Sequence, residues 1–221
     1  MSALIAAGMA RLILVRHGEA SGNRELRYLG TTDAPLTERG RRQAEQVARA
    51  LSVYAPAVVY TSPLVRAAET AAAIGADAGV AVRIDAELRE TAYGEWEGLT
   101  RAQVMAKAAT LLRRWEADAA MAPPGGGESL CETQRRVAAC ADKLAAHHAG
   151  TSLALVSHVG PVKALVSQAL GLGAEAARRM WLDPASISVV DWPAEPGGRA
   201  TLRLYNSIAH LADGVRWLPS Q

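Results

Sequence analysis

Arg16 and His17 are the first residues along the chain whose side chains together suit phosphate chemistry. They follow the apolar run of residues 12–15 directly and precede Gly18. A guanidinium presents a planar set of N–H donors that matches a phosphate group. An imidazole can act as nucleophile, acid or base near neutral pH. The pair predicts a site for an anionic substrate, and the competing interpretation is a strand followed by an ordinary polar turn.

Arg66 and His158 occupy comparable places further along the chain. The apolar run of residues 57–60 leads to Ser62 and Pro63, which we interpret as the N-cap and first residue of a helix, with Arg66 in its first turn. A second wholly apolar run leads into His158. Because parallel strands end at one edge of a sheet, and a helix N-terminus there attracts anions, we expect these groups to converge.

Two loops can bring further polar groups to the same edge. Asn23 lies in the loop of residues 20–35, and Glu90 lies in the glycine-punctuated loop of residues 88–99. Two arginines and two histidines around one point can neutralise a dianionic phosphoryl group, and phosphoryl transfer needs mainly positioning and charge neutralisation. No Asp and His cluster shows the spacing of metal ligands. The sequence therefore predicts a phosphoryl pocket that uses neither a metal nor a cofactor.

The elements that must position these residues alternate between apolar strands and amphipathic helices. This alternation is typical of the α/β class and predicts a three-layer α/β/α sandwich with a largely parallel sheet. Pro123 to Gly127 breaks the chain as a loop rather than as a domain linker. Helices are expected over about 37–51, 62–78, 100–119 and 129–150 and from 161 onward, and strands over 12–15, 57–60, 80–84, 152–157, 186–192 and 201–205.

Composition limits the possible functions. The 221 residues carry a formal net charge of +2, too small to indicate nucleic acid or membrane binding, and no apolar run is long enough to span a bilayer. Residues 1–10 lack a basic signal-peptide region and are expected to be a flexible tail before a single domain of residues 11–221. Cys131 and Cys140 are expected to fall on opposite faces of one helix and to remain free thiols, which favours a cytoplasmic protein.

Six motifs together resemble the histidine phosphatase superfamily. They occur in the order typical of that superfamily and extend over most of the chain, which makes the set far more specific than any one motif. The matching segments are LVRHGEA (14–20), APLTERGRRQA (34–44), TSPLVRAAETA (61–71), LRETAYGEWEGLT (88–100), GGES (126–129) and VSHVGPVKAL (156–165). The last segment is most similar to phosphatases of the α-ribazole phosphatase and acid phosphatase type.

The resemblance implies a phosphoglycerate mutase-like fold and a role for each matching residue. His17 would be the nucleophile that becomes phosphohistidine, and Glu90 would protonate the leaving group and later activate water. Arg16, Arg66 and His158 would line the phosphate pocket, with Asn23 assisting. The implied partner is a small phosphorylated substrate, and a homo-oligomer is possible.

One position departs from the pattern of the superfamily. Val159 follows His158 where a glycine is common. If the Val159 amide still points at the phosphate, little is lost; if glycine was needed for a positive φ, the loop is altered.

Two alternative functions stay open. A phosphoglycerate mutase is disfavoured because Glu90 is followed by Thr91 and Ala92 rather than Arg and His, and because the region after Trp115 is short. A catalytically inactive phosphate-binding module is disfavoured because His17 and the other matching residues are all present.

Overall fold

The computed structural model describes residues 5–211, and a single six-stranded sheet runs through this part of the chain. Short 3₁₀ turns include η2 (Ala86–Leu88) and η4 (Ala174–Arg179). The strands are β1 (Met9–Arg16), β2 (Val58–Thr61), β3 (Val82–Ile84), β4 (Ser152–Ser157), β5 (Ile187–Pro193) and β6 (Thr201–Ser207). The helices are α1 (Glu38–Leu51), α2 (Val65–Ala78), α3 (Arg101–Ala117), α4 (Leu130–His147) and α5 (Val159–Ala169).

The strand order β3-β2-β4-β1-β5-β6 places β1 and β4 at the centre of the sheet. The first four strands in this order are parallel, whereas β5 pairs antiparallel with β1 and with β6. Arg16 is in register with Ser157, and Val156 with Thr61. The carboxyl ends of β1, β2 and β4 therefore lie side by side at one edge, as predicted.

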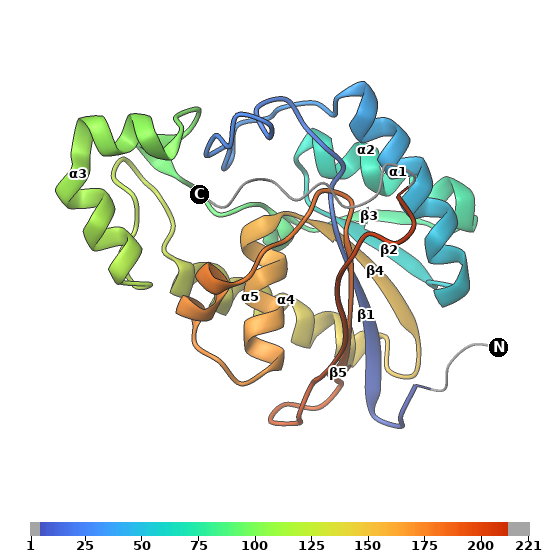
Figure 1. Ribbon diagram of the computed structural model, residues 1–221. Coiled ribbons are helices and arrows are strands. Elements are labelled where there is room, and N and C mark those ends of the chain that lie inside the picture. The colour runs from blue at the N-terminus through green and yellow to red at the C-terminus, as the bar shows by residue number, and fades with distance from the viewer. Residues whose placement is uncertain (1–4, 212–221) are drawn as a thin grey trace.

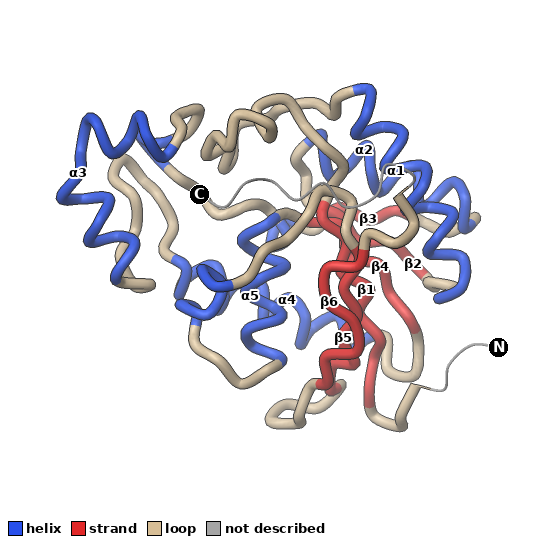
Figure 2. The backbone as a smooth tube through the Cα atoms, viewed as in Figure 1, coloured by secondary structure: helices blue, strands red, loops and turns tan. Residues whose placement is uncertain are grey.

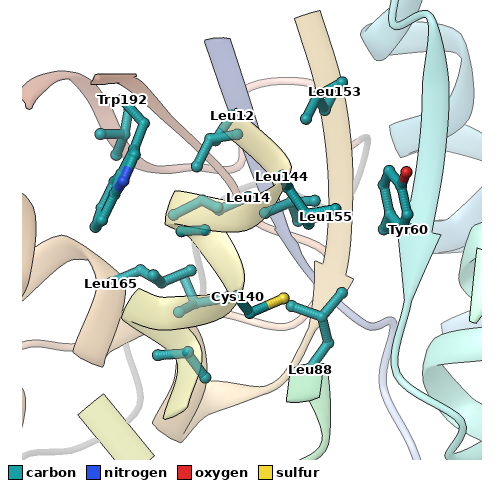
Figure 3. Packing of buried hydrophobic residues seen from close by; sticks show 14 of the residues in the cluster. Leu12, Leu14, Tyr60, Leu88, Cys140, Leu144, Leu153, Leu155, Leu165 and Trp192 are labelled. Carbon is teal, nitrogen blue, oxygen red and sulfur yellow. The ribbon is translucent and has the colours of Figure 1, made fainter. Parts of the chain in front are cut away.

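Helices cover both faces of the sheet, which confirms the predicted three layers (Figures 1 and 2). In β1 the side chains alternate: Leu12 and Leu14 pack with α4 and α5, whereas Ile13 and Val15 pack with α1 and α2. All four are fully buried. Figure 3 shows the α4 side, where Leu144 lies against Leu14 and Leu155. Burial on both faces explains why the central strands are continuous apolar runs.

Helix α3 stands beside the sandwich rather than on the sheet (Figure 1). It begins at the capping box of Thr100 and Gln103 and contains a non-helical residue, Ala108. Its buried side chains, which include Leu112 and Trp115, form a separate small core together with Trp96 from the preceding loop. We call α3 together with this core the α3 lobe.

Several element boundaries differ from the sequence prediction, and three of them change the interpretation of named residues. β1 starts at Met9, so Met9 and Ala10 pair with Pro193 and Trp192 instead of belonging to a tail. Helix α2 starts at Val65 after Leu64, so Ser62 and Pro63 precede the helix rather than cap it. Helix α5 starts at Val159, two residues before Pro161. Residues 1–4 and 212–221, including Trp217, lie outside the described part.

Candidate active site

His17 directly follows β1, and the hydrogen bonds of its ring show which nitrogen carries the proton. A carbonyl oxygen can only accept, so the 2.7 Å contact with Gly18 O means that His17 Nδ1 donates. Arg66 Nε donates to His17 Nε2 at 3.2 Å, so Nε2 carries the lone pair. Burial, together with Arg16 and Arg66, lowers the pKa of His17 well below its usual value. The imidazole is therefore neutral near neutral pH, and the lone pair of its Nε2 accepts from Arg66.

Arg66 is buried, with only 1% of its surface exposed, and hydrogen bonds hold its guanidinium group in place. Its Nη1 donates to Thr32 O and its Nη2 to Gly30 O, both at 2.8 Å. Glu97 orders this loop by accepting bonds from the backbone and hydroxyl groups of Thr31 and Thr32. The first turn of α2 and the loop after β1 thus fix one guanidinium beside His17.

Arg16 approaches His17 from β1 itself. Its Nη1 donates to Leu182 O at 2.6 Å, and its Nε has no hydrogen-bond partner in the described part of the chain. Burial lowers the pKa of Arg16 to about 10, which still leaves the guanidinium charged at neutral pH. A buried donor without a partner is costly, and an anion in the cavity would satisfy it.

His158 lies beside His17 and is not among the residues that line the cavity. Its ring is edge-on to that of His17 with the centroids 5.0 Å apart, and it is 0% exposed. Its Nε2 forms a 2.8 Å hydrogen bond with Ser62 Oγ, and its Nδ1 has no partner among the described residues. Burial is the main cause that lowers the pKa of His158 well below its usual value. Ser62, which we expected to cap α2, accepts from Leu64 N just before that helix and also bonds this histidine.

Glu90 lies shortly after η2. Its carboxylate accepts three backbone hydrogen bonds, two of them from the N-terminus of α5. Its Oε1 accepts from Thr91 N at 2.8 Å and Gly160 N at 3.0 Å, and its Oε2 accepts from Val159 N at 3.1 Å. These bonds lower its pKa, but burial outweighs them, so the pKa of Glu90 is raised. A carboxyl group with a raised pKa is suited to general acid catalysis.

The replacement of glycine by Val159 does not distort the loop. Val159 is the first residue of α5 and is not among the residues of positive φ. Its amide donates to Glu90 rather than lying free toward a phosphate. The glycine that the site does require is Gly160, where a Cβ would lie 2.6 Å from Glu90 Oε1 and 2.3 Å from Thr91 Oγ1.

A cavity of about 220 Å³ opens above His17. Six of the seven predicted residues line it, and His158 is the one that does not. The lining residues among the predictions are Arg16, His17, Asn23, Arg66, Glu90 and Val159. Asn23 also accepts a hydrogen bond from Ala20 N, which tightens the loop after β1.

Sequence reasoning missed part of the cavity wall. Lys163 and Trp181 line it, as do Tyr28 and Tyr93, which pack against the α3 lobe. Lys163 follows Val159 by four residues in a helix, and this spacing was the one signal that could have placed it at the site. Trp181 gave no local signal, because it lies in an irregular segment far from the motifs.

The described residues contain neither a group of three or more His, Cys, Asp or Glu side chains able to hold a metal nor a helix suited to crossing a membrane. Cys131 and Cys140 are both free.

Comparison with known proteins places the chain in a family. The model of the histidine phosphatase superfamily (branch 1) matches residues 12–207. A bifunctional protein of Mycobacterium tuberculosis is 37% identical over 202 residues, which are 91% of this chain and 55% of that protein, so the chain spans about half of that relative. Glucosyl-3-phosphoglycerate phosphatase of the same species is 33% identical over 219 residues, covering 94% of this chain and 91% of that enzyme.

Solved structures agree with this placement. The native mycobacterial glucosyl-3-phosphoglycerate phosphatase superposes with a TM-score of 0.79 at 32% identity, covering 91% of this chain and 99% of that one. A candidate α-ribazole-5′-phosphate phosphatase from Escherichia coli gives 0.78 at 32% identity, covering 90% and 96%. The predicted resemblance is confirmed: the chain belongs to branch 1 of the histidine phosphatase superfamily.

Proposed function

We propose that the protein is a phosphomonoesterase that acts on a small phosphorylated metabolite through a phosphohistidine at His17. The observation that carries the proposal is the state of that ring. Its Nδ1 donates to Gly18 O, and its Nε2 is unprotonated and accepts from Arg66 Nε. A neutral imidazole flanked by two guanidinium groups is suited to attack a phosphoryl group whose charge those groups neutralise.

The chemistry divides into two balanced steps. In the first, Nε2 of His17 attacks phosphorus, the ester P–O bond breaks, and Glu90 gives its proton to the leaving oxygen. In the second, Glu90 takes a proton from water as the water oxygen attacks phosphorus, the P–N bond breaks, and inorganic phosphate leaves. Arg16 and Arg66 stay charged throughout and hold the equatorial oxygens.

The cavity size and the relatives support a small substrate. The cavity of about 220 Å³ has room for a small phosphorylated molecule. The similar mycobacterial enzyme bears the name of a phosphatase that acts on glucosyl-3-phosphoglycerate, a small phosphate ester. A mutase would return the phosphoryl group to its substrate instead of releasing it, so release of inorganic phosphate separates the two functions.

The first prediction tests the nucleophile. His17→Ala should abolish hydrolysis of 4-nitrophenyl phosphate and leave the melting temperature close to that of the wild type, because the ring adds little to the core. Rapid quenching of the wild type with a ³²P-labelled substrate should trap an acid-labile, base-stable label on His17. Full activity in His17→Ala would refute the proposal, and a folded wild type that binds phosphate without turnover would support the inactive module instead.

A further inference from the structure

Arg16 is held by fewer hydrogen bonds than Arg66. Its side chain has a single hydrogen-bond partner among the described residues, Leu182 O, which accepts from Arg16 Nη1 at 2.6 Å. The side chain of Arg66 makes three hydrogen bonds. Leu182 is buried in the irregular segment that leads into β5. The direction in which the Leu182 carbonyl points therefore bears directly on where the Arg16 guanidinium lies.

The peptide group that supplies this carbonyl is held at its other end by Asn206. The carbonyl of Leu182 and the N–H of Asp183 belong to one planar trans peptide group, in which they point in opposite directions. Asn206 Oδ1 accepts from Asp183 N at 2.8 Å, and Asn206 Nδ2 donates to Asp183 Oδ2 at 2.9 Å. Because the peptide group is rigid, holding its N–H also fixes the direction of the carbonyl that binds Arg16.

Tyr205 secures the same peptide group from the preceding residue. The Tyr205 hydroxyl donates to the carbonyl of Trp181, and Trp181 Nε1 donates to Asp183 Oδ1 at 3.0 Å. The residues before and after Leu182 are therefore both bound by consecutive residues of β6, the edge strand beside β5 (Figure 2). This arrangement leaves the peptide group little freedom to rotate.

Asn206 reaches the segment before β5 because β6 contains a β-bulge. Between two matched pairs of the ladder, β6 has Tyr205 and Asn206 where β5 has only Ser188. Asn206 has a φ of 52°, in the left-handed region that asparagine enters more readily than most residues, and its N–H donates to Ser188 Oγ at 3.0 Å. Bulges beside active sites commonly redirect a side chain, and a backbone outlier there points to a functional constraint. Here the bulge directs the Asn206 amide to Asp183, the neighbour of Leu182.

We propose that Asn206 is a positioning residue: it fixes the Leu182–Asp183 peptide group and, through the carbonyl of that group, directs the Arg16 guanidinium toward the phosphoryl group. The proposal rests on the role of Arg16 in the proposed function and deepens it. Asn206 is not among the residues that line the cavity, so its effect on phosphate passes through Arg16. Asn206 should therefore matter for phosphate binding only while Arg16 is present.

A double-mutant cycle tests this dependence. Isothermal titration calorimetry gives the dissociation constant of inorganic phosphate for the wild type, Asn206→Gly, Arg16→Met and the double variant. Glycine adopts a positive φ without cost, so Asn206→Gly removes the amide and preserves the bulge. In the wild-type background this change should weaken phosphate binding by roughly 10-fold, the order expected when a hydrogen bond to a charged group is misaligned. In the Arg16→Met background it should weaken binding by less than about twofold, because no guanidinium remains to be positioned.

Two further variants separate positioning from stability. Tyr205→Phe removes only the hydroxyl that binds the Trp181 carbonyl, so it should weaken phosphate binding by a smaller factor and again only with Arg16 present. Arg203→Met removes a different bond between β6 and β5, from Arg203 Nε to Asp191 Oδ2 at 2.9 Å. It should leave phosphate binding within about twofold of the wild type, because its partner is far from the Leu182 carbonyl. Thermal melts identify the variants that fold, and Tyr205→Phe carries the cycle if Asn206→Gly does not.

Other outcomes would overturn the proposal. Unchanged phosphate binding in Asn206→Gly, or equal weakening in both backgrounds, would show that Asn206 does not act through Arg16. An equal loss in Arg203→Met would reduce the role of Asn206 to stabilising the edge strand. If Arg16→Met binds phosphate as tightly as the wild type, the phosphoryl pocket and this inference both fail. If the expected coupling appears but no phosphohistidine forms at His17, the proposed function fails while the positioning of Arg16 stands.

Discussion

Glu90 combines two opposing influences on one carboxyl group. Three backbone N–H groups stabilise its ionised form, while burial stabilises its protonated form. Burial is the larger effect, so the proton is retained to higher pH than in an exposed glutamate. The sequence alone left this balance undecided, because it depends on how deeply the loop after η2 is covered.

Glu90→Gln should separate leaving-group protonation from phosphate binding. The substitution keeps the shape of the side chain and removes the titrating proton, so turnover of glycerol 3-phosphate should fall by about 10²–10⁴-fold. The 4-nitrophenolate leaving group needs less protonation, so single-turnover phosphorylation by its ester should suffer less. Vanadate should still bind, because Arg16 and Arg66 remain. Equal losses for the two esters would show that another group is the acid.

The raised pKa of Glu90 also predicts a pH dependence. Below that pKa the carboxyl group holds the proton that it must donate; above it, the proton is lost. Single-turnover phosphorylation by glycerol 3-phosphate should therefore fall as the pH rises through a value above the usual range of glutamate, about 4.3. His17 contributes no acid limb in this range, because its pKa is lowered well below the usual value. The alkaline limb should be absent in Glu90→Gln, and its persistence there would exclude Glu90 as its cause.

The first turn of α5 holds the Glu90 carboxylate, and positions 159 and 160 of that turn differ in the side chain that they tolerate. A methyl group on Gly160 would meet Glu90 and Thr91 well inside van der Waals distance. Val159 has a side chain already and ordinary helical geometry.

Gly160→Ala should displace the Glu90 carboxylate and lower kcat for alkyl phosphates by at least about tenfold, because misplacement of a catalytic group costs that much or more. The matched control is Val159→Gly, which should change kcat by less than about threefold, since the amide that donates to Glu90 remains. Circular dichroism and thermal melts would establish that both variants fold. Equal kcat values for the two variants would show that the contact at Gly160 is unimportant.

Local patterns predicted most of the elements. Apolar runs gave β1, β2 and β4, and the Ser129–Glu132 capping box gave the start of α4. The sequence could not assign Met9 and Ala10 to β1, because the residues that they pair with, Pro193 and Trp192, lie about 180 residues away.

The same distinction between local patterns and long-range contacts applies to the residues of the candidate active site. Arg16 and His158 end local strand signals and were predictable from the sequence. Ser62 carries a strong N-cap signal, and its hydroxyl does accept from Leu64 N, but the same hydroxyl also bonds His158 and the helix begins later, at Val65. No local signal predicts that second, tertiary partner. Gly160 and Lys163 depend on which face of α5 meets Glu90, and that follows from packing rather than from any motif.

At the scale of the whole molecule, the α3 lobe provides one wall of the cavity. Tyr28 and Tyr93 line the cavity on one side and pack against the lobe core on the other. Their ring centroids are 4.9 Å apart, and Tyr28 is edge-on to Trp115 at 6.0 Å. The position of the lobe therefore contributes to the shape of the cavity.

Arg178 of η4 ties this lobe to the sandwich. Its Nη2 donates to the backbone carbonyl of Trp115, and its guanidinium carbon lies 4.4 Å from the centroid of the Trp115 ring. A cation–π contact of this kind contributes about 0.5–2 kcal/mol, which is enough to change the population of a locally opened state. Because α3 packs beside the sheet rather than on it, loss of this tie should loosen the lobe before it affects the central strands.

Arg178→Met should therefore increase hydrogen exchange of α3 amides by about 5–30-fold, the factor that corresponds to about 1–2 kcal/mol. Exchange in α1 and α2 should be unchanged, because these helices pack on the sheet away from the lobe. The KM for glycerol 3-phosphate should rise while kcat changes little, since the Tyr28 and Tyr93 wall moves but the phosphoryl pocket does not. Arg179→Met is the matched control, because Arg179 is the exposed neighbour of Arg178 in η4. Faster exchange across the whole chain in Arg178→Met would show instead that Arg178 stabilises the fold globally, and the lobe would then be no independent unit.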